Sequence, residues 1–177
     1  MSPQEVLTFW TAAGRERWFR KDSAFDDEFR SRFLTAHEAA ARGELDGWQA
    51  TSDGALALLI LLDQFPRNCF RASPRMYATD AKARAVARAA HEAGLDLQAE
   101  PDLRGFFYLP FMHSESMADQ DLCVRLMEPL GGESLRYAQH HRAIVQRFGR
   151  FPHRNAVLGR PSSREEDTFL QEGGFAG

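Results

Sequence analysis

The longest apolar stretch of the chain, residues 55–62, is apolar on every side rather than on one face. It is too short to cross a membrane and too rich in leucine for a typical strand, so the pattern predicts a buried helix. Ser52 or Asp53 can cap its start. Pro66 disfavours helical geometry at Phe65, so we expect the helix to end there.

Apolar positions elsewhere repeat at helical spacing. Phe25, Phe29 and Phe33 form one stripe, which is typical of core packing, in a helix closed by Gly43. A capping box at residues 2–5 and another near residues 162–166 predict a first and a last helix. Further helices are expected over residues 73–93, 111–128 and 133–148, with a loose tail after residue 172. No stretch alternates as a strand does, so the predicted fold class is all-α, with about seven or eight helices joined by short loops.

The composition is that of one globular domain, expected to cover residues 1–177. The net charge is only −3, but no acidic residue occurs between Glu133 and Glu165, and residues 136–160 of this stretch carry six arginines and three histidines. This basic segment suits an anionic partner or pairing with carboxylates elsewhere in the chain. Neither a signal peptide nor a stretch of transmembrane length is found, so we expect a cytoplasmic protein with no membrane partner.

Polar side chains follow the apolar run directly. Asp63 is predicted in the last helical turn, where the helix dipole disfavours an anion, and Arg67 follows four residues later. Gln64 and Asn68 add amides. The group is either an ion pair that fixes the end of the helix or one wall of a polar site, and the first interpretation is favoured.

The helix expected after Pro110 carries a second polar group. Glu115 falls on its apolar stripe, Asp119 lies four residues later on a neighbouring edge, and His113 lies in the first turn. A buried carboxylate must be paired or change its pKa. Glu115 and Asp119 are therefore interior ion-pair partners, a general acid/base pair or, together with His113, metal ligands, and the sequence favours the structural role.

A third polar group lies in residues 147–155, where arginines, a histidine and an asparagine alternate with phenylalanines. Arginine side chains bind carboxylate or phosphate groups at two points, and the phenylalanines could stack on bases of RNA. Alternatively these arginines neutralise Asp63, Glu115 and Asp119. We expect the two Phe-Pro turns, at Phe65 and Phe151, to lie close together with their arginines converging on those carboxylates. His141 and Tyr137 are predicted to lie on the face of their helix that points to the protein core.

Standard signatures of phosphate loops, serine hydrolases, zinc proteases and di-iron bundles are absent. The two cysteines have no metal or redox spacing. We therefore predict no metal and no cofactor.

The blocks LLDQFPRN, YLPFMHSES and RFGRFPHRN, with WF at residues 18–19, resemble the bacterial domain-of-unknown-function family 924, over residues 6 to 169. That family is similar to tetratricopeptide-like proteins. The resemblance implies helices packed as antiparallel pairs around the buried central helix, and it implies no activity.

We hypothesise a polar cleft that binds a small anionic ligand or a peptide terminus. One alternative is a protein-interaction module with a peptide-binding helical groove, and another is RNA binding through residues 136–160. His113 and Glu115 are the catalytic candidates if a reaction occurs, which the sequence leaves open. The expected ligand-binding residues are Asp63, Gln64, Arg67, Asn68, Tyr108, Asp119, Arg150, His153, Arg154 and Asn155.

Overall fold

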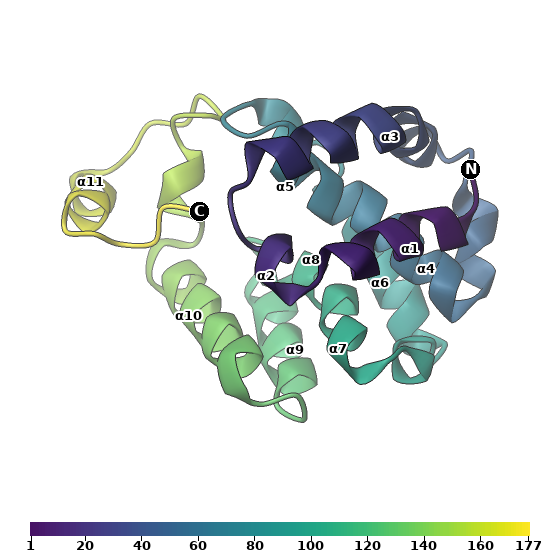
Figure 1. The fold of residues 1–177 in the computed structure, drawn as a ribbon. Coiled ribbons are helices and arrows are strands. Elements are labelled where there is room, and N and C mark those ends of the chain that lie inside the picture. Colours follow the sequence, from purple (N-terminus) through teal and green to yellow (C-terminus); the bar gives the residue numbers. More distant parts are fainter. The chain divides into compact units, whose positions relative to one another are not determined.

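The computed structural model describes all 177 residues, contains no β-strand and confirms the all-α prediction (Figure 1). The chain forms two compact units. Unit 1 comprises Met1–Arg71 and Arg75–Pro110, and unit 2 comprises Ala72–Pro74 and Phe111–Gly177. The single domain expected over residues 1–177 stays a prediction. No helix is long and apolar enough to cross a membrane.

Unit 1 holds most of the helices and 3-10 turns. In chain order they are α1 (Pro3–Ala13), α2 (Arg15–Trp18), α3 (Ser23–Arg42), η1 (Asp46–Ala50), α4 (Ser52–Leu59), the π-helix η2 (Ile60–Gln64), α5 (Phe65–Cys69), α6 (Asp80–Glu92), η4 (Asp96–Gln98), α7 (Pro101–Arg104) and η5 (Gly105–Phe107). The short elements η3 (Pro74–Tyr77) and α8 (Leu109–Met112) lie where the chain passes between units. Unit 2 contains α9 (Met117–Met127), α10 (Gly132–Phe148), η6 (Pro152–Arg154) and α11 (Arg164–Gln171).

The buried central helix is confirmed: every residue from Gly54 to Asp63 is buried. Thr51 caps it by accepting a hydrogen bond from the Gly54 N–H, in place of the predicted Ser52 or Asp53. Gly54 is required here, because a Cβ at this position would lie 2.0 Å from the Trp48 carbonyl oxygen.

The predicted end of this helix at Phe65 is wrong, because the chain passes through Pro66 by widening into the π-helix η2. The Phe65 N–H donates to the Ile60 carbonyl, one residue further back than in an α-helix. Side chains then satisfy the carbonyls that lose their usual donors. His37 Nδ1 lies 2.8 Å from the Leu61 oxygen. Thr79 Oγ1 donates to the Leu62 oxygen, whose α-helical donor would have been the missing N–H of Pro66.

Aromatic rings pack α1 against α3 in unit 1. The Phe9 ring lies 5.2 Å from Phe25, 5.2 Å from Phe29 and 5.1 Å from Phe33, measured between centroids. The phenylalanine stripe of α3 is therefore core packing, as the sequence predicts.

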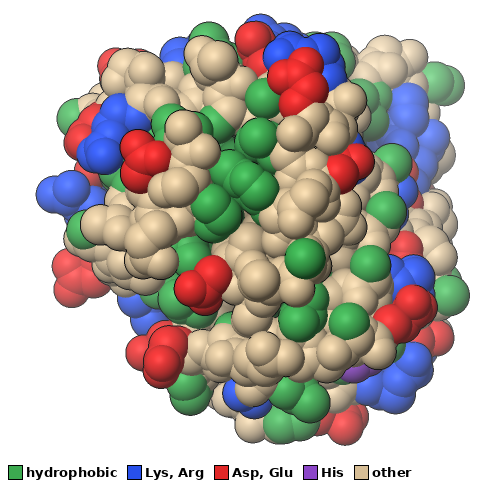
Figure 2. Space-filling view, turned by 90° about the vertical axis from the view of Figure 1, so that its right-hand side faces the viewer, with side chains coloured by type: hydrophobic (Ala, Val, Ile, Leu, Met, Phe, Trp, Pro, Cys, Tyr) green, Lys and Arg blue, Asp and Glu red, His purple; other side chains and the backbone are tan.

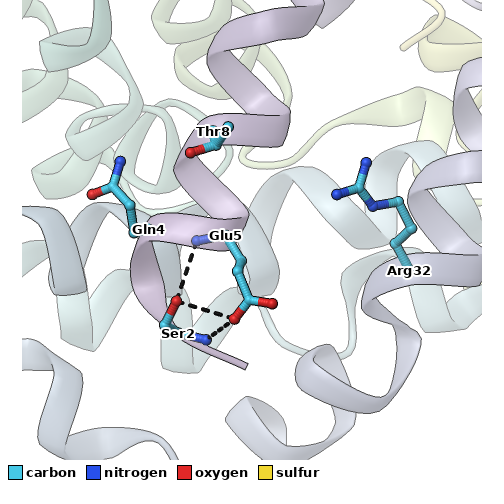
Figure 3. A pocket seen from close by; sticks show the side chains of 5 residues that line it. All are labelled: Ser2, Gln4, Glu5, Thr8 and Arg32. Carbon is cyan, nitrogen blue, oxygen red and sulfur yellow. Dashed lines mark hydrogen bonds between the residues drawn. The ribbon is translucent and has the colours of Figure 1, made fainter.

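The predicted capping box of α1 is also present (Figure 3). It lies in a shallow surface hollow lined by Ser2, Gln4, Glu5, Thr8 and Arg32. Backbone and side-chain hydrogen bonds from Ser2 hold the pKa of Glu5 below its usual value. The carboxylate in this hollow therefore serves the helix start. On the face shown in Figure 2, charged side chains of both signs are interspersed.

Unit 2 is built on the antiparallel pair α9 and α10, which lie side by side (Figure 1). Ile144, Val145 and Phe151 form its core. The predicted single helix over residues 111–128 is wrong, because α8 ends at Met112 and α9 begins at Met117. The side chain of Gln120, which lies in α9, reaches back to this break: its Nε2 donates to the carbonyl oxygens of Met112 and Ser114 at 2.7 and 2.6 Å. The side chain thus replaces helical hydrogen bonds that the sequence pattern implied.

Other predicted boundaries hold in part. Ser163 and Glu166 form the capping box of α11, and Gly149 closes α10 in the left-handed conformation. The helix expected from residue 73 begins only at Asp80, after the 3-10 turn η3. Tyr137, expected on the inner face of α10, is half exposed.

Candidate functional site

The predicted site residues fall into two groups, one in each unit. Unit 1 holds Asp63, Gln64, Arg67, Asn68 and Tyr108, and unit 2 holds all the others. The two Phe-Pro turns belong to different units, and their convergence on one cleft stays a prediction.

In unit 1, Asp63 belongs to an ion-pair network at the π-helix. Arg67 Nη1 lies 3.1 Å from Asp63 Oδ1 and 2.9 Å from Asp80 Oδ1, and Gln64 donates to Asp63 at 2.7 Å. Burial works against the charge of Arg67, but Asp63 and Asp80 outweigh it and hold the pKa of Arg67 above its usual value. The geometry supports the favoured structural interpretation of this group.

Asn68 and Tyr108 donate hydrogen bonds to other carboxylates of unit 1. Asn68 donates to Asp26 at 2.9 Å. The Tyr108 hydroxyl donates at 2.9 Å to Asp96, which also lies 3.0 Å from His91 Nδ1. Burial and this hydrogen bond raise the pKa of Tyr108. Asp96 is fully buried, and sequence reasoning missed it because it lies in a segment without a motif.

In unit 2, Glu115 anchors the late Phe-Pro turn. It accepts hydrogen bonds from the Phe151 N–H at 2.8 Å and from two nitrogens of Arg160 at 2.7 and 3.0 Å. Burial opposes its ionisation, but Arg160 and the Phe151 N–H outweigh burial and lower the pKa of Glu115. The predicted contact of Glu115 with an arginine is confirmed, whereas the burial predicted for this residue is only partial. Its side chain keeps 27% exposure, because it lies in the loop before α9 and not on a helical stripe.

The other predicted residues of unit 2 surround this anchor. Arg154 donates to the His113 carbonyl at 2.8 Å, and its guanidinium lies 4.6 Å from the centroid of the Phe151 ring. Asn155 accepts from Arg160 Nε at 3.0 Å. Asp119, in the first turn of α9, accepts from the Ser114 hydroxyl at 2.7 Å. The late turn and the loop at 113–119 are therefore brought together.

Arg147 and Arg150 pair with α11 rather than with the predicted carboxylates. Arg147 Nε lies 2.9 Å from Glu165. Arg150 contacts both oxygens of Glu166, at 2.6 and 2.7 Å. Hydrogen bonds from Arg150 lower the pKa of Glu166 to about 2. Glu165 and Glu166 were assigned only to a helix cap, so their pairing with the basic segment was missed.

Phe151 also contacts a cluster of aromatic side chains. His141 lies 5.6 Å from Phe151 and 4.7 Å from Phe175, between ring centroids. His153 lies 5.7 Å from Phe151 and 5.1 Å from Phe175. We call these four rings, with His140 at 5.8 Å from Phe175, the imidazole cluster. The tail, expected to be loose, therefore places Phe175 among histidine rings.

Two histidines of this cluster are held uncharged. Burial, and then the neighbouring His113, lower the pKa of His141 to about 3. Burial, and then Arg154, lower the pKa of His153 to about 4. His141 Nδ1 lies 2.8 Å from the Tyr137 carbonyl, so this nitrogen carries the proton. His153 Nδ1 is buried and has no hydrogen-bond partner.

No group of three or more His, Cys, Asp or Glu side chains is arranged to hold a metal ion. Cys69 and Cys123 are buried and form no disulfide, and burial raises the pKa of each thiol to about 12. A thiol in that state is a poor nucleophile.

Comparison with known proteins identifies a family but no activity. Residues 6–174 match the family described as bacterial protein of unknown function (DUF924). A solved structure, that of the protein of unknown function ATU0120 from Agrobacterium tumefaciens, is 53% identical and has a TM-score of 0.95. The similarity covers 97% of each chain. A search of curated proteins found no match.

Proposed function

The chain belongs to the DUF924 family of bacterial proteins of unknown function, and from its geometry we propose that it is a peptide-binding interaction module. The binding surface is the imidazole cluster of unit 2. The observation that carries the proposal is the seat of Phe175, an aromatic side chain of a short peptide segment held among His140, His141 and His153.

The ion pairs of unit 2 argue against the alternatives that require exposed arginine charge. Five arginines of the segment 136–160 pair with carboxylates: Arg136 with Glu133, Arg142 with Asp121, Arg147 with Glu165, Arg150 with Glu166 and Arg160 with Glu115. The sixth, Arg154, is buried against Phe151. An RNA phosphate or a small anion would have to displace a carboxylate from this segment, so a peptide is the better candidate.

The cluster suits an aromatic side chain in particular. Neutral imidazoles present flat rings, and their edge-to-face contacts with a benzene ring each contribute about 0.5–1.5 kcal/mol beyond area burial. His153 Nδ1 also lacks a hydrogen-bond partner, and in the tautomer protonated at Nε2 it accepts a hydrogen bond from a backbone N–H or a hydroxyl of an incoming peptide.

The Phe175 ring is only partly buried against the core of unit 2, and the tail around it is mostly exposed. Two glycines precede this residue, and the residues on either side of the Gly174–Phe175 pair are exposed. Segments with few buried contacts open at low free-energy cost. We therefore propose that a partner peptide carrying an aromatic residue between small residues replaces the tail at this seat.

The test uses the full chain with Phe175→Ala and the peptide EGGFAG, which reproduces residues 172–177. NMR signals of the His141 and His153 rings should shift saturably on the variant, with a dissociation constant on the order of 1 mM, equivalent to about 4 kcal/mol. The wild-type chain should respond more weakly, because its tethered tail competes at an effective concentration in the millimolar range.

Two controls make the result specific. The peptide EGGAAG should leave the signals unchanged, and His91 of unit 1 provides a reporter that should not move with either peptide. Unchanged His141 and His153 signals on the variant at 10 mM peptide, about ten times that constant, would overturn the proposal. Equal shifts with EGGAAG would show that no aromatic side chain is recognised.

The same proposal includes two finer expectations. Stacked antiparallel helix pairs of the tetratricopeptide type would suit an interaction module, and the α9–α10 pair is consistent with them. We also propose that binding takes place in the cytoplasm.

A further inference from the structure

A second surface, in unit 1, combines an exposed aromatic ring with positive charge. Phe19 lies between α2 and α3 with 65% of its surface exposed, the largest exposure of any phenylalanine. Arg15, Arg17, Arg20 and Lys21 flank it in the sequence and are all exposed. We call these five residues the Phe19 patch.

The exposed ring rests on a rigid aromatic base. Phe19 stacks on the buried Phe106 ring with an interplanar angle of 14° and a centroid distance of 6.0 Å. Trp18 contacts both rings edge-on, at 6.5 Å from Phe19 and 5.0 Å from Phe106. One side of the Phe19 ring is thus supported by the core, while most of its surface stays accessible to another flat ring.

The charge around the ring is positive on balance. Residues 15–22 contain these four cations and only two carboxylates, Glu16 and Asp22. Arg20 pairs with Asp22 at 3.3 Å, whereas Arg17 and Lys21 form no such pair. This distinguishes the Phe19 patch from the five arginines of unit 2 that pair with carboxylates.

We propose that the Phe19 patch binds single-stranded nucleic acid. A base stacks on the exposed face of Phe19, and the neighbouring phosphates lie against Arg17 and Lys21. Stacking platforms combined with cations are the general means by which proteins bind single strands, because every base has a flat face and every linkage a charge. A duplex hides its base faces, so it cannot use Phe19.

The test is fluorescence anisotropy of a labelled twelve-nucleotide oligothymidine titrated with the full-length protein at 25 and 200 mM NaCl. Binding should weaken as salt rises, since phosphate contacts release counterions. Phe19→Ala should weaken binding about tenfold, and Phe19→Trp should retain it. The double variant Arg17→Ala, Lys21→Ala should reduce the salt slope by about 1.4, about 0.7 for each lost phosphate contact.

The matched control is Tyr137→Ala. Tyr137 is also an exposed aromatic beside an arginine, but Arg136 is paired with Glu133. This variant should bind as the wild type does. Because the Phe19 ring is mostly exposed, Phe19→Ala should keep the circular dichroism spectrum of the folded protein, so lost binding cannot be attributed to unfolding.

Several results would overturn the proposal. Equal affinities of Phe19→Ala and wild type would show that no base stacks there. Equal affinities for the single strand and its duplex would indicate charge attraction alone. Binding to phosphatidylglycerol vesicles without binding to the oligonucleotide would identify the patch as a membrane contact instead.

Discussion

Replacing Glu115 by alanine should destabilise unit 2 by about 2–3 kcal/mol. The change leaves the buried Phe151 N–H without an acceptor, which costs about 1–3 kcal/mol. It also removes the partner of Arg160. Breaking a fully buried ion pair costs about 3–5 kcal/mol, whereas exposed pairs are worth about 0.2–1 kcal/mol. Since the Arg160 side chain is 24% exposed and keeps its bond to Asn155, water compensates part of the loss.

Urea denaturation gives the free energy, and hydrogen exchange of the Phe151 amide reports the local effect. That amide should lose protection in Glu115→Ala and keep most of it in Glu115→Gln, which retains an acceptor oxygen. The control Glu133→Ala breaks an exposed pair and should cost less than about 0.5 kcal/mol.

A double-mutant cycle isolates the ion pair itself. Glu115→Ala combined with Arg160→Ala should give a coupling energy of about 1–2 kcal/mol, because the two side chains are in direct contact. A loss below about 0.5 kcal/mol for Glu115→Ala, with unchanged exchange at Phe151, would refute the anchoring role derived from the geometry.

Three further predictions concern other sites. Thr79→Val should lower the free energy of unfolding by about 1–2 kcal/mol relative to Thr79→Ser, because only serine keeps the hydroxyl donor to the π-helix; equal urea midpoints would contradict this. Between pH 7.5 and pH 5 the free energy of unfolding should fall by up to about 2 kcal/mol for each of His141 and His153. The reason is that their pKa values in the folded protein lie below the ordinary 6.5, so the unfolded chain takes up protons first as pH falls. The pH dependence of the urea midpoint measures this loss, and replacing either histidine by asparagine should reduce it. Cys69 and Cys123 should resist Ellman's reagent at pH 8 in the native protein and react in guanidinium, and rapid native labelling would show that their burial is incomplete.

Local signals in the sequence were enough to place most helices. Asp22, Gly149 and Ser163 act within one helical turn of their own positions, so their capping roles can be predicted without knowledge of the fold. The apolar run before Asp63 likewise predicts burial, because a helix without a polar face must be covered.

The misplaced boundaries have a common cause in side chains that bind backbone carbonyls in place of helical N–H groups. The central helix continues through Pro66 because Thr79 supplies a donor from another segment. The helix predicted over residues 111–128 is broken before α9 because Gln120 satisfies the carbonyls of the loop. At the candidate site, sequence spacing indicated that Glu115 needs a cation but could not select Arg160, 45 residues away. The role of Phe175 was missed because tail residues between glycines carry no periodic pattern.

The dependence of the π-helix on side chains from elsewhere has a consequence for folding. His37 lies 24 residues before the carbonyl it contacts, and Thr79 lies 17 residues after its own. Until α3 and the segment before α6 have docked, those carbonyls have only water as a partner, and residues 60–66 gain little from helical geometry. We therefore expect an isolated peptide of residues 52–69 to be helical only before Ile60. The most buried helix of unit 1 should be completed late, when contacts distant in the sequence form.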